Sequence, residues 1–415
     1  MATIIYRKSN DRKYTVKYSV IHSLYWSIFC SSCSFAAVFL LAKHFTNSQI
    51  GVVLAAANIL AVFLQPAVAA FSDATKKISM KNLTALLVGM AGAATAARYF
   101  VPARFGVLAT MFILELTILF TLQPLVNSLG MNLINRGVSI NFGLARGLGS
   151  LAFAVLSLFL GTLVDRCGPD SLTVVSFALY AGLAVSVFTF TGNSSGQALS
   201  PSDRAENPLS KPTGNLAAFA LQHKKFSVLI IAVALTFSSH TMINNYMIQI
   251  MKNMGGNATN MGIATGIAAA IELPTMVFFG YLVKKVRCSS IIKFSLLFFL
   301  IKTVLTLLAN SVWMIYAAQL FQCCSYALFI PASIYYVNMI IPHDDLAKGQ
   351  AFMTSAITLG GVGASLVGGL LLDGSGVRGM LIAGSVAAAL GLVIGLFTTE
   401  KTSLNHPAAD PEKTD

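Results

Sequence analysis

Four charged residues lie deep inside long apolar stretches of the sequence: Glu115, Arg146, Glu272 and Lys302. On insertion scales a lone charge at the centre of a hydrophobic helix costs about 2.5 to 3.5 kcal/mol, so each of these residues requires a partner, water or a function. Two acids and two bases can neutralise one another. This set of charges is typical of a polar cavity enclosed by apolar helices.

Glu272 is the strongest candidate for proton chemistry. It lies in an apolar run two residues before Pro274, and a carboxyl group in such surroundings can load and unload a proton as its access to water changes. Lys302, in another apolar run, is its natural counter-charge. The same two residues could instead form a static pair that joins two helices. Glu115 is a further proton-coupling candidate, which could pair with Arg98 or Arg104 or line the cavity.

The sequence lacks the motifs of other kinds of chemistry. It contains no Walker motif, no nucleophile elbow and no H-E-x-x-H pattern, so ATP-driven pumping and hydrolysis lack their catalytic parts. Cys30 and Cys33 have no histidine or second cysteine pair at ligand spacing, and Cys323 and Cys324 are adjacent. We therefore expect no enzyme activity, no metal site and no cofactor.

The elements that must position these residues are membrane-spanning helices. Of the 415 residues, 56% are hydrophobic and only 10% are charged, whereas soluble domains carry about 25% charged residues. A spanning helix needs about 20 apolar residues, because the hydrocarbon core is about 30 Å thick. Twelve stretches meet this requirement and predict an all-α integral membrane protein: 18–41, 49–71, 83–100, 105–126, 138–164, 172–190, 226–250, 261–283, 291–309, 312–339, 351–372 and 380–397.

The distribution of basic residues predicts the orientation of the chain. With an even number of spans, 20 of the 28 Lys and Arg residues fall in segments on the side of the two termini, and six fall in segments on the opposite side. Because cytoplasmic loops are rich in Lys and Arg, we predict a multi-pass protein of the plasma membrane with both termini in the cytoplasm. The net charge of +13 then reflects topology, and no nucleic-acid partner is expected.

The longest polar segment between spans divides them into six and six. Residues 191–223 are rich in Ser, Gly, Pro and Asn, which is typical of a flexible linker. We predict an N-terminal six-helix bundle at 1–191, a cytoplasmic linker at 192–222, and a C-terminal six-helix bundle with a short cytoplasmic tail at 223–415. A shift of 208 positions indicates a repeat, since it superimposes Lys17 on Lys225, Pro66 on Pro274, Lys76-Lys77 on Lys284-Lys285, Gly161 on Gly369, Asp165 on Asp373 and Gly168 on Gly376.

Three local patterns carry a family resemblance. The first runs from Ser48-Gln49-Ile50-Gly51 through Phe63-Leu64-Gln65-Pro66 to Ser72-Asp73, the second is Phe142-Gly143-Leu144-Ala145-Arg146 with Gly149, and the third is Glu272 ahead of Pro274. With these patterns the chain resembles the major facilitator superfamily, and more closely its oligosaccharide:proton symporter branch. The loop signature of that family, G-x-x-x-D-x-x-G-[RK], is degenerate here, with Asp73, Lys76 and Lys77 at its acidic and basic positions.

The resemblance implies the major facilitator fold and a sugar site. Arg146 falls where the branch places an arginine that holds sugar hydroxyls, and Phe153, nearly two helical turns later, falls where the branch places an aromatic ring that stacks on the sugar. Asn127 stands at the position of that arginine's acidic partner, and Glu272 belongs to the same predicted substrate site. From the residues alone, Arg146 could instead extend to the cytoplasmic interface, and Phe153 could serve packing.

The resemblance does not extend to the proton-coupling residues of the branch. Phe321 and Cys324 stand where the branch has a His and a Glu on its tenth helix. Lys302 stands where the branch has an arginine. Proton coupling in this chain would therefore need another arrangement, through Glu272 with Lys302 or through Glu115.

The sequence therefore predicts a secondary active transporter that moves a small polar organic solute by alternating access, with proton coupling. A sugar or oligosaccharide is the favoured solute. A nucleoside or aromatic-acid permease and a drug/proton exporter share this architecture and are the alternatives. A membrane sensor that has lost transport is disfavoured, because four buried charges have little use without turnover. The expected partners are the solute, the proton and the lipid bilayer.

Overall fold

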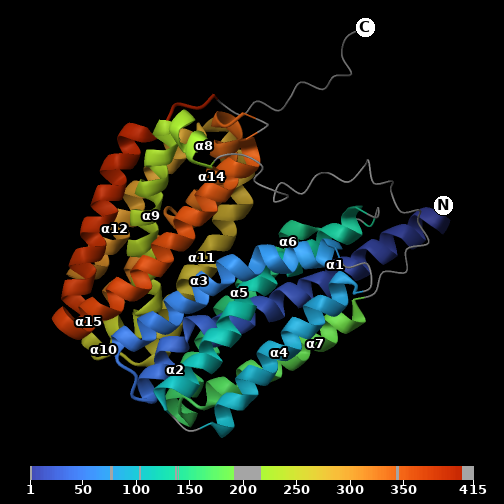
Figure 1. Cartoon of the computed structure of the whole chain (residues 1–415), viewed down its shortest axis with the longest axis horizontal. Helices are drawn as coiled ribbons and strands as arrows, with labels where there is room; N and C mark the ends of the chain where they lie inside the picture. Colours follow the sequence, from blue (N-terminus) through green and yellow to red (C-terminus); the bar gives the residue numbers. More distant parts are fainter. Residues whose placement is uncertain are drawn as a thin grey trace. The chain divides into compact units, whose positions relative to one another are not determined.

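The apolar stretches of the sequence form helices, which satisfy their own backbone groups as a membrane requires. The computed structural model describes residues 2–74, 78–101, 104–135, 138, 140–190, 216–342 and 345–403, and every regular element in these ranges is helical (Figure 1). The first half contains α1 (Ala2–Ile28), the π-helical segment η1 (Phe29–Ser34), α2 (Ala36–Ala42), α3 (Asn47–Ala74), α4 (Met80–Phe100), α5 (Phe105–Asn135), α6 (Phe142–Cys167) and α7 (Ser171–Thr189). The second half contains α8 (Leu216–Gln222), α9 (Lys224–Asn245), α10 (Met247–Asn253), α11 (Ala258–Lys285), α12 (Cys288–Leu308), α13 (Val312–Leu320), α14 (Tyr326–Ile340) and α15 (Leu346–Thr398).

Ten helical segments in the described ranges are long and apolar enough to cross a membrane. This number is compatible with twelve spans, because two of the helical boundaries differ from the predicted ones. The predicted continuous span at 312–339 is broken into α13 and α14 by a turn at 321–325, and the two spans predicted at 351–372 and 380–397 are joined in α15. The predicted all-helical membrane fold is confirmed.

The internal repeat is visible in the backbone at two glycines. Gly168 ends α6 with a φ of 82°, and Gly376 interrupts the helical geometry of α15 with a φ of 71°. A side chain at such a φ would be strained, and only glycine adopts it at little cost. The two glycines are 208 positions apart, so the same device ends the equivalent helix in each half of the sequence.

The predicted linker at 192–222 lies mostly outside the described residues. Its last seven residues form α8, although the sequence predicts a flexible segment there. The physical reason is that these residues are mostly apolar. Phe219 is buried and packs against Phe226 and Phe352, so α8 is part of a hydrophobic core.

The described residues divide into two compact units. Unit 1 comprises Met1–Ala205, Asn244–Ala270 and Ser365–Val377, and unit 2 comprises Glu206–Ile243, Ile271–Ala364 and Arg378–Asp415. In unit 1, α1 packs against α6 and α7, α4 packs against α5 and α7, and α3 packs against α5 (Figure 1). In unit 2, a core of aromatic side chains joins α9, α12 and α14 through Phe237, Phe299 and Phe329.

Candidate functional site

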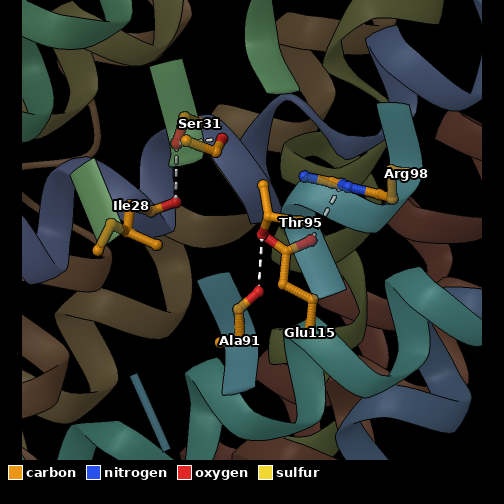
Figure 2. Close-up of polar contacts among 7 residues, drawn as sticks. Ile28, Ser31, Ala91, Thr95, Arg98 and Glu115 are labelled. Atoms are coloured by element: carbon orange, nitrogen blue, oxygen red, sulfur yellow. Dashed lines mark hydrogen bonds and ion pairs between the residues drawn. The ribbon is translucent and has the colours of Figure 1, made fainter. Parts of the chain in front are cut away.

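The first buried charge cluster joins α4 to α5. Arg98 lies in the last turn of α4, and its Nη1 is 3.0 Å from Oε2 of Glu115 on α5, with side chains 3% and 0% exposed (Figure 2). Of the two arginines that the sequence offers as partners of Glu115, the structure therefore selects Arg98. Burial in a low-dielectric environment makes each charge dependent on the other, since an unpaired one would be strongly destabilising.

Aromatic rings and hydroxyl groups enclose this ion pair. The guanidinium carbon of Arg98 lies 4.1 Å from the centre of the Phe112 ring and 5.5 Å from that of Phe39, which adds a cation–π attraction. Thr95, one turn before Arg98, lies beside the carboxyl group of Glu115 and donates its own hydroxyl to the carbonyl of Ala91 at 2.9 Å (Figure 2). Both side chains of the pair are thus buried within unit 1.

The second cluster is an arginine held against an aromatic wall. The guanidinium carbon of Arg146, on α6, lies 4.0 Å from the centre of the Trp26 ring on α1, and Nη1 of Arg146 donates to the hydroxyl of Ser150 at 3.3 Å. Trp26 in turn packs against Tyr25 and Phe29, with ring centres 5.4 and 5.3 Å away. Arg146 is half-buried.

A glycine allows the indole ring to lie against α6. A Cβ atom at Gly149 would lie 2.6 Å from Cδ1 of Trp26, a distance that only displacement of the ring could relieve. The pattern Phe142-Gly143-Leu144-Ala145-Arg146 with Gly149 therefore contains both the charged residue and the space that its aromatic partner occupies.

Two other residues of the predicted substrate site have different surroundings. Phe153 is half-buried on α6, and the ring that contacts Arg146 is Trp26. Asn127 is half-buried on α5, where its backbone carbonyl accepts a hydrogen bond from the hydroxyl of Tyr18 at 3.3 Å. The sequence indicated Trp26 as a residue of the membrane interface or a ring-stacking surface, but it did not predict the contact with Arg146, which lies 120 residues away. The available signal was its rarity, since the chain has only two tryptophans.

The third cluster is a charged chain in unit 2. Lys302 of α12 donates to Oε1 of Gln322 at 2.6 Å, and Nε2 of Gln322 donates to Oε1 of Glu272 on α11 at 2.7 Å. Lys302 and Gln322 are 1% and 3% exposed, and Glu272 is half-buried. Glu272 and Lys302, predicted as partners, are therefore linked through the amide of Gln322, which the sequence did not place between them.

Gln322 can bridge the two charges because its helix is broken. It lies in the turn at 321–325 between α13 and α14, where the backbone leaves the helical path. The sequence predicts a single long span at 312–339 that can tilt or bend, but hydropathy alone did not indicate where the turn lies. Gln319 and Gln322 were the available signal, since each amide in an apolar run needs a hydrogen-bond partner or a role.

The degenerate loop signature lies mostly outside the residues that the structure describes. Asp73 lies near the end of α3, and Lys76 and Lys77 lie outside the described residues. Their predicted role in conformational change stays a prediction.

Comparison with known proteins gives the same class of molecule. A family model, the MFS_1 like family, matches residues 15–383. The uncharacterized transporter YwbF of Bacillus subtilis (strain 168) is 24% identical over 371 residues, which cover 88% of this chain and 89% of that protein. The maltose permease of Geobacillus stearothermophilus is 22% identical over 362 residues, which cover 86% of this chain and 87% of that protein.

The solved structures show the same fold. A mutant of the nucleoside transporter NupG superposes with a TM-score of 0.77 at 14% identity, covering 93% of this chain and 98% of that chain. The family model spans most of the chain, and the relatives with matching length are transporters. This protein therefore belongs to the MFS_1 like family of the major facilitator superfamily and is a membrane transporter.

Proposed function

We propose that the protein is a proton-coupled secondary transporter that takes up a small polar organic solute, with a sugar or oligosaccharide as the favoured solute. The observation that carries this proposal is the Arg146 guanidinium held 4.0 Å over the Trp26 ring. The similarity to a maltose permease over most of both chains supports the choice of solute class.

The chemistry of this pair suits a saccharide. A guanidinium group offers several donors in a rigid plane, which matches the adjacent oxygens of a sugar. The tryptophan and its neighbours Tyr25 and Phe29 present a large apolar surface, against which the C–H face of a sugar ring can pack. Phe153 and Asn127 extend the proposed site along α6 and α5.

The same aromatic wall favours a second candidate, a nucleoside or aromatic-acid permease. A planar base or ring could stack on Trp26, and Arg146 could bind a carboxylate or a ring oxygen. The two candidates differ in what the arginine contributes, because sugar binding depends on its donors for most of the polar contacts.

Proton coupling is assigned to the chain formed by Lys302, Gln322 and Glu272. In its ionised form Glu272 accepts a hydrogen bond from an amide that is itself polarised by Lys302. A proton on Glu272 would remove the negative charge from this chain and change the balance of charge around Lys302. Coupling requires that the two charge states of this network favour different conformations of the transporter. The Arg98–Glu115 pair is the alternative coupling site.

The first test is a ligand screen by thermal shift on the purified protein in detergent, with maltose, a nucleoside and an aromatic acid as ligands. A ligand in large excess over its Kd stabilises the folded state, by about 2.7 kcal/mol at a concentration of 100 times Kd. We expect maltose or a related sugar to raise the Tm of the wild type, and we expect this increase to be lost in Arg146→Ala.

The matched control is Arg166→Ala, since Arg166 is exposed at the other end of the same helix. A sugar-dependent increase in Tm that persists in Arg146→Ala would contradict the proposed site. A nucleoside or aromatic-acid response without a sugar response would select the second candidate.

The direction of transport and the orientation of the chain follow from the same proposal. We infer uptake across the plasma membrane, with both termini in the cytoplasm, from the excess of basic residues on the side of the termini. Substrate-driven efflux from intact cells would instead select an exporter.

A further inference from the structure

Two aspartates at helix ends each hold the start of a helix from the opposite half of the sequence. Asp165, near the end of α6, accepts hydrogen bonds from the backbone N–H groups of Ala258 and Thr259 at 3.2 and 2.7 Å and from the Thr259 hydroxyl at 2.6 Å. These two residues are the first of α11. A first-half carboxylate therefore caps a second-half helix, and both segments belong to unit 1.

Asp373 makes the reciprocal contact. It accepts hydrogen bonds from the backbone N–H groups of Asn47 and Ser48 at 3.1 and 2.7 Å, from the Asn47 side-chain amide at 2.8 Å and from the Ser48 hydroxyl at 2.6 Å. Asn47 and Ser48 are the first residues of α3, and this contact also lies within unit 1. A second-half carboxylate thus caps a first-half helix in the same way.

The two contacts repeat residue by residue. The pattern Ser157, Gly161, Asp165 recurs 208 positions later as Ser365, Gly369, Asp373. A Cβ atom on Gly161 would lie 3.0 Å from the carbonyl carbon of Ala258, and one on Gly369 would lie 3.0 Å from that of Asn47. In each half, a glycine one turn before the aspartate lets the backbone of the partner helix approach closely enough to reach the carboxylate.

The serines, two turns before each aspartate, extend both contacts by one turn beyond the glycines. The Ser157 hydroxyl donates to the carbonyl of Gly262 at 3.0 Å, and the Ser365 hydroxyl accepts from the side-chain amide of Asn245 at 3.0 Å. Gln249 adds a hydrogen bond to the side chain of Asn47 at 2.9 Å. Each contact therefore consists of a glycine that allows close approach, polar side chains that hydrogen-bond across it, and a carboxylate at its end.

We propose that Asp165 and Asp373 are paired latches that hold one face of the transporter closed. The first N–H groups of a helix have no partner within the helix, and a carboxylate placed there is favoured both by hydrogen bonds and by the helix dipole. The residue that precedes each helix supplies a local cap for one N–H group: Thr46 Oγ1 accepts from the Gln49 N–H at 3.2 Å, and Asn257 Oδ1 accepts from the Asn260 N–H at 3.1 Å. The first two N–H groups of each helix are instead capped by an aspartate 93 or 326 residues away in the sequence, so this part of each cap exists only while the two halves of the chain are in contact.

The contacts of Asp165 and Asp373 can break, because both carboxylates have access to water. Asp165 and Asp373 are both exposed, so water can replace the helix N–H groups as partners, and the net strength of each hydrogen bond is modest. A transporter that works by alternating access must separate its halves at this face once in each cycle, and in this respect the inference rests on the proposed function. The distribution of basic residues predicts that the face is the extracellular one.

The test measures how often this face opens. The protein used for labelling, here called the host, carries two substitutions. Cys167→Ser removes an exposed native thiol. Ser365→Cys introduces a thiol close to the Asp373 contact, at a position whose native side chain is 0% exposed. Intact cells are treated with a membrane-impermeant maleimide. We expect the double substitution Asp165→Asn with Asp373→Asn to raise the labelling rate about tenfold, since each amide replaces a charge-assisted acceptor with a weaker one.

Asp170→Asn is the matched control. Asp170 is exposed near Asp165 and pairs with Lys43 at 2.7 Å, but this pair joins two segments of the first half only. The proposal expects no change in labelling from Asp170→Asn. The host without Ser365→Cys gives the background.

An unchanged labelling rate in the double variant would overturn the proposal. If the double variant does not reach the membrane, the single variants Asp165→Asn and Asp373→Asn replace it, with an expected increase of about threefold each, and no increase in either has the same meaning. Labelling of sealed inverted vesicles, in place of intact cells, would show that the face has the opposite orientation. No solute is needed for this measurement, so its result is independent of the solute proposal.

Discussion

At the scale of single residues, Gln322 determines how Glu272 and Lys302 interact. An amide is the one neutral side chain that can accept from a lysine with its oxygen and donate to a carboxylate with its nitrogen, and Gln322 does both at 2.6 and 2.7 Å. We expect Gln322→Leu to reduce proton-driven solute accumulation about tenfold, because hydrogen bonds to charged groups contribute about 1.5–3 kcal/mol each. Solute binding at Arg146 should be retained. Uptake into proteoliposomes, with and without a pH gradient, checks this prediction.

A matched control lies three residues earlier. Gln319 is 0% exposed, and its amide has no hydrogen-bond partner among the described residues. Leucine at an unsatisfied buried amide is expected to be neutral or stabilising, so Gln319→Leu should leave coupling unchanged. Equal losses in Gln319→Leu and Gln322→Leu would mean that the break between α13 and α14, rather than the bridge, is what coupling requires.

At the scale of elements, the Arg98–Glu115 pair fixes α4 to α5 inside unit 1. Breaking a buried ion pair from one side leaves an uncompensated charge and costs about 3–5 kcal/mol, whereas replacing both partners with apolar residues is often neutral. We therefore expect Glu115→Gln to lower the Tm of the purified protein, and the double substitution Arg98→Met with Glu115→Leu to restore most of it. A single variant that keeps wild-type stability but loses proton-driven uptake would instead assign coupling to Glu115.

The positions of the helices were largely predictable from the sequence, but the contacts between residues of different helices were not. Hydropathy places the spans because about 20 apolar residues are needed to cross the hydrocarbon core, and the shift of 208 that matches Gly168 with Gly376 was readable from the residues. The position of the break at 321–325 was not, since hydropathy does not separate a turn from a helix there and the amides Gln319 and Gln322 indicate only that a hydrogen-bond partner is needed. The contact of Arg146 with Trp26 depends on the rotation of α1 and α6 about their axes, which residue spacing within each helix does not determine.

The candidate sites were predicted in part for the same reason, since the sequence gives local signals but not contacts between distant residues. The buried charges were found by their cost in an apolar segment, which is a local property of the sequence. Their partners Gln322 and Trp26 are uncharged. An amide in an apolar run and a rare tryptophan mark each of them as a candidate, but no local signal indicates which charge each one contacts. Family resemblance indicated Arg146 as a sugar ligand and Phe153 as the ring that stacks on the sugar, and both roles stay predictions. It did not indicate that the ring beside Arg146 is Trp26.

At the scale of the whole molecule, proton coupling links the proposed solute site at Arg146 with the proposed proton site at Glu272. We expect a conformational change of the chain to carry this coupling. Linkage requires that such coupling be reciprocal, so a proton on Glu272 and a solute at Arg146 must favour one another's binding.

This reciprocity predicts that coupling and exchange can be separated. Glu272→Gln mimics a permanently protonated carboxyl group, so it should exchange labelled for unlabelled solute across proteoliposomes at close to the wild-type rate. It should fail to accumulate solute against a gradient, because no proton can be released inside. One proton per solute supports accumulation of about tenfold for each pH unit, since one pH unit corresponds to about 1.4 kcal/mol. Arg146→Ala should lose both exchange and accumulation. Accumulation by Glu272→Gln that still follows the imposed pH gradient would exclude Glu272 as the coupling residue and leave the Arg98–Glu115 pair as the site to examine, whereas loss of exchange in the same variant would make Glu272 part of the solute site.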